Sequence, residues 1–282
     1  MSTPLSFYRK CSVTVITLSS LLFTPFTLQA KTAQEVLQGD TPEAIGWAIA
    51  KESDDRDIGF HDQTSQMRMV LRNAYGEENT RLMRLKVLEN PDLNVGDKSI
   101  IVFDEPRDIA GTALLSHAKI LEADDQWLYL PALKRTKRIS SNNKSGPFMG
   151  SEFAYEDITA NEINKFDWKY LNSEPCGDLT CFKLETTPKY EYSGYTKRIV
   201  WVDQSEFRVQ QIDYYDRKNS LIKTQTYHGY KKYLDNKYWR ANEWKIVNHQ
   251  NGKSTELHFD SFEFNTGLSD NDFTQSALQR VR

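Results

Sequence analysis

The spacing of apolar residues along the chain changes close to Gly59. Before that point, residues 42–54 place apolar side chains at helical spacing, which predicts an amphipathic helix. Thr41 offers a side-chain oxygen at the expected N-cap position, and Pro42 suits the first turn of a helix. The apolar residues on one face of this helix are Ile45, Ala48 and Ile49. After Gly59, apolar and polar residues alternate, and this alternation indicates β-strands.

The alternating segments follow one another to the end of the chain, with turn sequences between them. The strongest turn signal is Asn251-Gly252, a pair that favours a tight two-residue hairpin. A short closing helix is predicted over 268–280, with Ser269 or Asp270 as its N-cap. The segments predicted as strands are 66–75, 81–89, 99–106, 114–120, 126–133, 135–139, 166–171, 181–188, 197–203, 208–216, 221–233, 238–250 and 254–265.

This pattern predicts a mainly β protein of the α+β class. We expect about ten or eleven antiparallel strands in a sequential meander, and a sheet of that size curls instead of staying flat. One face of such a sheet is apolar and must be covered. Because only a few helices are available, we expect an unclosed barrel whose concave apolar face is covered by them. An ordinary closed barrel or sandwich without a cavity is the alternative.

The first thirty residues have the layout of a secretory signal peptide. Arg9 and Lys10 form a basic start, and residues 11–28 carry no charge. Pro25 interrupts the apolar run, and Leu28-Gln29-Ala30 is a suitable cleavage sequence. An uncleaved membrane anchor is the rival interpretation, since the run is about as long as the shortest spanning helices. We therefore expect residues 1–30 to be removed and residues 31–282 to form a single domain in the periplasm.

Charge and composition narrow the function classes. Removal of residues 1–30 takes away two cations and no anion, so the net charge moves from −3 to −5. An acidic balance of this kind argues against a general nucleic-acid binder. The five histidines are scattered, and the chain has no phosphate-binding loop, nucleophile elbow or zinc motif. We therefore expect neither catalysis nor a cofactor nor a metal.

Two cysteines follow the predicted signal peptide, at Cys176 and Cys181 in the sequence "PCGDLTCF". Gly177-Asp178 between them suits a tight turn, and export exposes the pair to an oxidising compartment. A metal site would need two more soft ligands nearby, and none is present in the sequence around them. We predict a structural disulfide across a hairpin.

A basic stretch stands out against the acidic background. It contains Lys134, Arg135, Lys137, Arg138 and Lys144, without an acidic residue among them. The sequence "SSNNKSGP" that follows is typical of a mobile loop, and Phe148-Met149-Gly150 ends it. We predict a hinged flap whose Phe148 and Met149 reach a cavity mouth. A solvated strand edge beside a disordered turn is the alternative.

Two blocks of the chain resemble the LolA-like superfamily of periplasmic outer-membrane lipoprotein-sorting proteins, and the longer branch associated with RND-type exporters in particular. The blocks are 100–118 and 124–158. The matching residues are Phe103, Pro106, Arg107, Gly111, Leu115, Trp127, Tyr129, Leu130, Pro131, Arg135, Arg138, Phe148, Met149, Gly150, Phe153, Tyr155 and Asp157. The resemblance implies an unclosed barrel capped by helices, with an apolar cavity that shelters acyl chains.

On this resemblance and on the adaptable methionines, we expect a carrier or chaperone for a lipid or lipoprotein. The residues expected in the cavity and flap are Met69, Met83, Leu85, Phe103, Leu115, Trp127, Tyr129, Phe148, Met149, Phe153 and Tyr155. Arg135 and Arg138 are expected to contact head groups or a partner.

The expected partner is an inner-membrane transporter of the RND or ABC type, contacted by a monomer that touches membranes only peripherally. A docking module without cargo and a cell-envelope hydrolase are the alternative classes.

Overall fold

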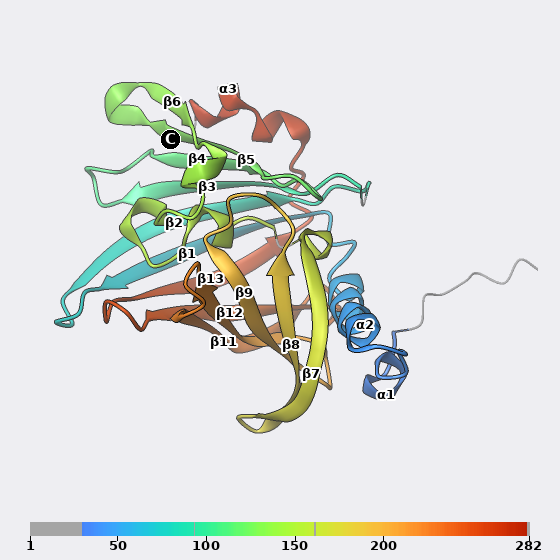
Figure 1. The fold of residues 1–282 in the computed structure, drawn as a ribbon. Helices are drawn as coiled ribbons and strands as arrows, with labels where there is room; N and C mark the ends of the chain where they lie inside the picture. Colours follow the sequence, from blue (N-terminus) through green and yellow to red (C-terminus); the bar gives the residue numbers. More distant parts are fainter. Residues whose placement is uncertain (1–29, 93, 161, 281–282) are drawn as a thin grey trace, which may run out of the picture.

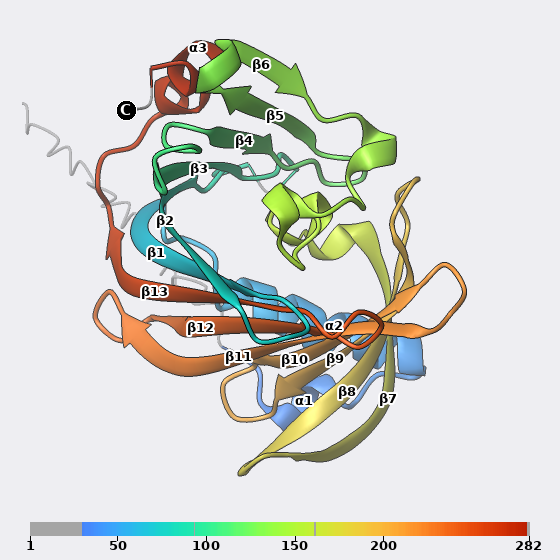
Figure 2. The ribbon, with the colours of Figure 1, turned by 90° about the vertical axis from the view of Figure 1, so that its left-hand side faces the viewer.

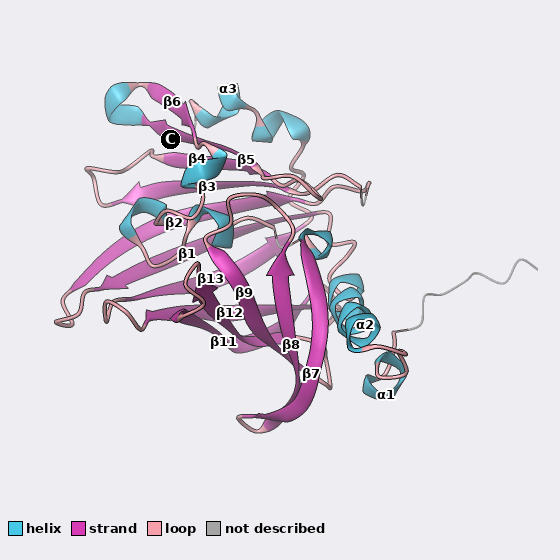
Figure 3. Ribbon diagram, in the orientation of Figure 1, coloured by secondary structure: helices cyan, strands magenta, loops and turns pink. Residues whose placement is uncertain are grey.

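The computed structural model describes residues 30–92, 94–160 and 162–280. The predicted signal peptide therefore lies almost entirely outside the described residues. Within them, the chain is dominated by strands, with few helices (Figure 3). The strands are β1 (Asp62–Arg72), β2 (Glu78–Leu88), β3 (Lys98–Glu105), β4 (Ala113–His117), β5 (Asp125–Leu130), β6 (Arg135–Arg138), β7 (Phe166–Cys176), β8 (Leu179–Pro188), β9 (Tyr195–Asp203), β10 (Val209–Asp216), β11 (Leu221–Tyr233), β12 (Tyr238–Asn248) and β13 (Ser254–Phe264).

All thirteen strands belong to one antiparallel sheet, in the order β6-β5-β4-β3-β2-β1-β13-β12-β11-β10-β9-β8-β7. Each predicted strand segment corresponds to one of them, so the sheet has more strands than the ten or eleven expected. Strands that follow each other along the chain pair with each other, except β6 and β7, and the pairing of β1 with β13 joins the two halves of the sheet. The sheet curls without closing, because its edge strands β6 and β7 do not pair (Figure 2). The predicted unclosed barrel is confirmed.

Three α-helices accompany the sheet in the described part of the chain: α1 (Ala33–Val36), α2 (Pro42–Asp55) and α3 (Gln275–Leu278). The helix predicted over 42–54 is α2, and the side chain of Thr41 accepts a hydrogen bond from the Ala44 main-chain N–H at 3.1 Å. Short 3-10 turns make up the remainder: η1 (Pro131–Leu133), η2 (Ser141–Asn143), η3 (Phe148–Gly150), η4 (Tyr155–Asp157), η5 (Ile163–Lys165) and η6 (Asp270–Phe273). The predicted closing helix is divided into η6, which begins after Ser269, and α3, which begins after Thr274.

The gap between β6 and β7 is crossed by residues 139–165, which we call the strap. In Figure 2 the strap passes through the inside of the curved sheet, and in Figure 1 α2 stands beside β7 at the other end of the concave side. The helix approaches that strand closely at Gly46, where an added Cβ would lie 2.7 Å from the Lys169 main-chain N. The strap and α2 therefore cover different parts of the same concave surface.

Buried apolar side chains form three clusters. One lies on the concave side under the strap and includes Phe103, Phe148 and Phe153. A second lies under α1 and α2 and includes Ile49 and Phe182. The third lies on the opposite face of β3 and β4, where Ile100, Val102, Ala113 and Leu115 pack against Phe273 and Leu278 of the C-terminal segment. Only α1 and α2 thus cover the concave face as predicted, and the C-terminal helix covers the convex one.

Candidate functional site

A cavity of about 850 Å³ lies between the strap and α2, inside the curve of the sheet. Its apolar wall is built by alternate residues of strands from both halves of the sheet, because alternate side chains of a strand point to the same face. The apolar and aromatic strand residues of this wall are Met67, Leu85, Val87, Ile101, Phe166, Trp168, Val200, Val202, Ile212, Tyr214, Tyr227, Tyr230, Trp239, Trp244, Leu257, Phe259 and Phe262, and Phe207 joins them from the turn between β9 and β10. The cavity therefore joins the two concave clusters.

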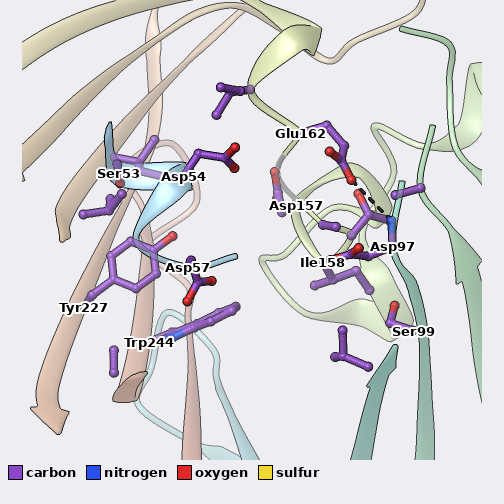
Figure 4. Close-up of a pocket in the computed structure, with 18 of the residues that line it drawn as sticks. Ser53, Asp54, Asp57, Asp97, Ser99, Asp157, Ile158, Glu162, Tyr227 and Trp244 are labelled. Carbon is purple, nitrogen blue, oxygen red and sulfur yellow. Dashed lines mark hydrogen bonds between the residues drawn. The ribbon is translucent and has the colours of Figure 1, made fainter. Parts of the chain in front are cut away.

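Carboxylates stand on two sides of the cavity (Figure 4). Asp54 and Asp57 come from the end of α2 and the turn after it, while Asp97 directly precedes β3 and Glu162 belongs to the strap. The Asp97 main-chain N–H donates to Glu162 Oε1 at 3.4 Å. Tyr227 and Trp244 line the cavity on the same side of the view as Asp54 and Asp57, so aromatic side chains accompany these two carboxylates (Figure 4).

These carboxyl groups bind protons more readily than exposed ones. Burial, with the neighbouring charge of Glu162, raises the pKa of Asp54 to about 6. Burial raises the pKa of Asp97 to about 7, and the charges of Glu162, Glu89 and Asp57 act in the same direction. Burial also raises the pKa of Glu162. The charged side of the cavity therefore changes its net charge near neutral pH.

The strap is tied to the sheet by buried polar contacts. Lys223 Nζ on β11 pairs with Asp157 Oδ2 at 2.5 Å, with both side chains at most 5% exposed. Tyr195 on β9 donates its hydroxyl to the other oxygen of Asp157 at 2.8 Å. At the two ends of the strap, Lys144 donates to the Asp124 main-chain carbonyl and Lys165 pairs with the Asp124 carboxylate. Strands from both halves of the sheet thus hold the strap in place.

The expected hinged flap is therefore a packed segment in this structure. The ring of Phe148 is buried against Phe103 at a centroid distance of 5.7 Å, and Met149 lies at the edge of the same cluster. The Met149 carbonyl accepts a hydrogen bond from Arg81 Nη1 at 2.6 Å. Neither Phe148 nor Met149 lines the cavity. The sequence indicated a loop from its Ser, Asn and Gly content, and it did not reveal that Lys144 is buried.

The eleven residues expected in the cavity and flap fall into three groups. Leu85 lines the cavity. Seven more belong to the apolar cluster between the strap and the sheet, against which Leu85 also packs: Met69, Met83 and Phe103 from the sheet, and Phe148, Met149, Phe153 and Tyr155 from the strap. Leu115, Trp127 and Tyr129 belong instead to the convex cluster under the C-terminal segment.

The position of Leu115, Trp127 and Tyr129 has a simple physical reason. Leu115 pairs directly with Trp127 across β4 and β5, so the two side chains must share a face. Leu114 and Leu128, one residue away on the same strands, occupy the concave face. Both faces of this part of the sheet are apolar because η6 and α3 cover the outer one. Alternation alone could not distinguish the inner face from the outer face here.

Several cavity residues were not among those expected, and Phe262 shows why. Met67 pairs with Phe259 while the preceding Gln66 pairs with Ser261, so Asp260 forms a β-bulge. The bulge places Phe259 and Phe262 on the same face, with their rings stacked at 5.1 Å, although strict alternation would separate them. The high aromatic content of β13 was the feature of the sequence that could have indicated these cavity residues.

Arg135 and Arg138 lie on the edge strand β6 and are exposed. Arg138 Nη2 contacts Asp125 Oδ1, so part of its charge is neutralised locally. Arg135 has no ion pair or hydrogen bond from its side chain to any described residue. The two arginines are therefore not equivalent as candidates for contact with another molecule.

The predicted disulfide between Cys176 and Cys181 is present, with a Cα–Cα distance of 5.8 Å across the β7–β8 hairpin. Among the described residues, no three His, Cys, Asp or Glu side chains are grouped so that they could hold a metal ion. No helix in the described part of the chain has the length and apolar character needed to cross a membrane.

Comparison with known proteins places the fold among lipoprotein-sorting proteins. A family model described as "uncharacterized protein" matches residues 96–280. A crystal structure from Vibrio parahaemolyticus, named for an outer membrane lipoprotein-sorting protein domain, is 51% identical, with a TM-score of 0.82 over 84% of this chain and 100% of the other. A DUF1329 family protein from Desulfovibrio piger is 29% identical, with a TM-score of 0.79 over 84% of this chain and 99% of the other.

A LolA superfamily protein from Nitrosomonas europaea shares the fold at 22% identity, with a TM-score of 0.65 over 82% of this chain and 98% of the other. No curated protein sequence matches this chain.

Proposed function

The chain belongs to the LolA-like superfamily of outer-membrane lipoprotein-sorting proteins, and on that premise we propose that it is a soluble periplasmic carrier. It binds the acyl chains of a lipid or lipoprotein in the cavity and transfers this cargo between the envelope membranes. Residues 1–30 direct the chain to the periplasm in this proposal, and the mature protein acts as a monomer without a cofactor.

The observation that carries the proposal is the cavity between the strap and α2. Its volume of about 850 Å³ lies within the range of about 300–1,000 Å³ that is common for sites of small organic ligands. Sequestering an acyl chain from water stabilises the complex by about 0.8 kcal/mol for each methylene group. A wall of aromatic, aliphatic and methionine side chains provides this environment without a specific polar partner for the chain.

Within this proposal, Leu85 contacts the cargo directly together with wall residues such as Met67 and Trp244. The seven expected residues of the cluster between the strap and the sheet do not line the cavity, so in this proposal they close off the space available to the acyl chain. The carboxylates of Asp54 and Asp97 lie at the charged side, where the polar part of a cargo molecule would remain near water.

The proposed partner is an inner-membrane transporter of the RND or ABC type. Support for it comes from the sequence blocks 100–118 and 124–158, which resemble the exporter-associated branch. Arg135 is the candidate contact with this transporter or with lipid head groups, because it is exposed and its side chain has no partner among the described residues.

Mass spectrometry of organic extracts of purified residues 31–282 tests the proposal. We expect lipids or acylated peptides to copurify, and to be depleted from the cavity-filling variant Ser99→Trp. Ser99 is half-buried and faces the cavity, whereas Ser220 is exposed in the β10–β11 turn and supplies a matched control, Ser220→Trp. A wild-type protein that carries no acyl compound, yet still binds a transporter, would instead be a docking module.

A further inference from the structure

We propose that the tip of the β5–β6 hairpin, residues 131–137, is the surface through which this protein contacts an anionic lipid bilayer. The inference deepens the proposed carrier function and rests on it, since a carrier of acyl chains must approach the membranes between which it transfers them. The partner is the bilayer surface itself, recognised by its phosphate groups and by the apolar layer beneath them.

The tip presents a leucine to solvent in a defined conformation. η1 follows β5, and Lys134 closes the turn in the left-handed region with φ of +47° while its N–H donates to the Pro131 carbonyl at 3.1 Å. Leu133, at the end of this turn, is 63% exposed. Pro131 packs close to Gly111 in the β3–β4 turn, so a second hairpin supports the tip from behind. Leu133 is thus held in water by a closed turn.

Unpaired cations surround this leucine. Lys134, Arg135 and Lys137 are exposed, and none of their side chains has a hydrogen bond or ion pair to a residue in the described part of the chain. The next cation, Arg138, is already paired with Asp125. Because the whole chain has a net charge of −3, this concentration of positive charge is local. An exposed leucine between free cations fits a bilayer interface, where the side chain enters the apolar boundary and the cations meet phosphates.

Strand pairing directs these cations toward the cavity side of the sheet. Arg135 pairs with Leu130 and Lys137 pairs with Leu128, and both leucines belong to the concave cluster. Residues on paired positions share a face, so the two cations lie on the concave side of the edge strand. β6 leads directly into the strap, which forms part of the cavity wall through Ser141 and Lys144. A bilayer bound at the tip therefore adjoins the segment that separates the cavity from solvent.

Cosedimentation with vesicles tests the inference. Purified residues 31–282 are mixed with vesicles of phosphatidylcholine alone or of phosphatidylcholine with phosphatidylglycerol, at low and at high salt. We expect binding only to the anionic vesicles, weakened by salt because exposed charges are screened. The triple variant Lys134→Glu, Arg135→Glu, Lys137→Glu should bind about 100-fold less tightly. The matched control is Lys218→Glu, Lys231→Glu, Lys253→Glu, which reverses three exposed cations elsewhere and should bind like the wild type.

An environment-sensitive dye separates bilayer contact from attraction to any acidic surface. Coupled to Leu133→Cys, it should shift its emission to shorter wavelength on anionic vesicles. Coupled to Leu234→Cys in the β11–β12 turn, the dye should show no such shift, because that turn lies away from the β5–β6 hairpin. Tyr238, which follows the turn, donates its hydroxyl to the Ile58 carbonyl shortly after α2. Equal binding of the triple variant and the wild type would overturn the inference. Vesicle binding without any shift at Leu133 would overturn it as well.

A fluorescent acyl probe, added to the same proteins without vesicles, distinguishes this inference from the carrier function. The triple variant should bind the probe as the wild type does, because the hairpin tip is outside the cavity wall. Absence of probe binding in the wild type would contradict the carrier function. The vesicle assay alone decides whether the hairpin contacts a bilayer.

Discussion

The strap and α2 cover the same concave surface, but different interactions hold them there. α2 packs through an apolar face centred on Ile49, which is fully buried, and through the close approach of Gly46 to β7. The strap also buries apolar rings, but its attachment depends on ionic contacts such as Lys223 with Asp157. α2 is therefore held mainly by burial of apolar area, whereas the strap combines buried apolar rings with charges that need their partners.

This difference has a functional meaning for a carrier. An apolar interface has no single group whose change releases it, whereas a buried ion pair becomes unfavourable once one partner is lost or neutralised. The strap is thus the cover whose stability can be altered locally, and it borders the cavity at Asp157 and Lys165. α2 supplies the permanent wall of the same cavity.

The largest expected effect comes from breaking the strap's central ion pair. Lys223→Met leaves Asp157 buried without its cation, and we expect the free energy of unfolding to fall by about 3–5 kcal/mol. Urea unfolding followed by circular dichroism measures this loss. The exposed Lys218→Met is the control and should change stability by less than about 0.5 kcal/mol.

A double variant sharpens this prediction. Combining Lys223→Met with Asp157→Leu removes both charges, so the double variant should be more stable than Lys223→Met alone. If the second substitution instead adds its own full destabilisation, the two residues are not coupled and the strap is held by its apolar contacts. The strap and α2 would then be covers of the same kind.

The next effect concerns α2. Alanine forms helices better than glycine by about 1 kcal/mol, so propensity alone predicts that Gly46→Ala stabilises the protein. The added Cβ would lie 2.7 Å from the Lys169 nitrogen and 2.8 Å from the Tyr170 nitrogen, both main-chain atoms of β7. We therefore expect a loss of about 1–3 kcal/mol. Ala44→Ser on the exposed side of the helix should cost less than about 0.5 kcal/mol. A stabilised Gly46→Ala variant would show that α2 does not pack closely on β7.

The smallest effect concerns the carboxylates that face each other from α2 and the strap side. The pKa of Asp97 is about 7 in the folded protein, above its ordinary value of 3.8. The folded state therefore keeps a proton that the unfolded chain releases, and its stability falls as pH rises from about 4 to 7. Asp97→Asn removes this loss and should be more stable than the wild type at pH 8 by on the order of 1 kcal/mol.

Urea unfolding of both proteins between pH 4 and pH 8 measures the difference. The two stability curves should converge at low pH, where Asp97 is protonated in both states. If the two curves stay parallel across this range, the pKa of Asp97 is that of an exposed carboxylate. Water would then reach the Asp97 side chain from the cavity.

The difference between the strap and α2 also explains which features could be predicted from the sequence. The α2 helix was predicted from Thr41, Pro42 and the spacing of its apolar residues, because those signals are local. The strand segments and the Cys176–Cys181 disulfide were local as well. The attachment of the strap could not be predicted, since Lys223 is far from Asp157 in the chain and nothing near either residue indicates the pair.

The residues that line the cavity could be predicted only in part. The alternation along a strand divides its residues between two faces, but it does not indicate which face lies inside the curved sheet. Leu85 lines the cavity, whereas Leu115 and Trp127 face the C-terminal segment. The bulge at Asp260 added a second difficulty by reversing the alternation before Phe262. Both features depend on tertiary packing: the position of η6 and α3 in one case, and the pairing of β1 with β13 in the other.

Titration of a fluorescent acyl probe into the wild type, Ser99→Trp and Ser220→Trp tests most directly that the cavity binds acyl chains. We predict saturable binding to the wild type and to Ser220→Trp with equal affinity. Ser99→Trp should bind at least about tenfold more weakly, because its indole occupies the space of the acyl chain. Absence of saturable binding to the wild type, or unchanged affinity in Ser99→Trp, would contradict the proposal that this cavity is the carrier site.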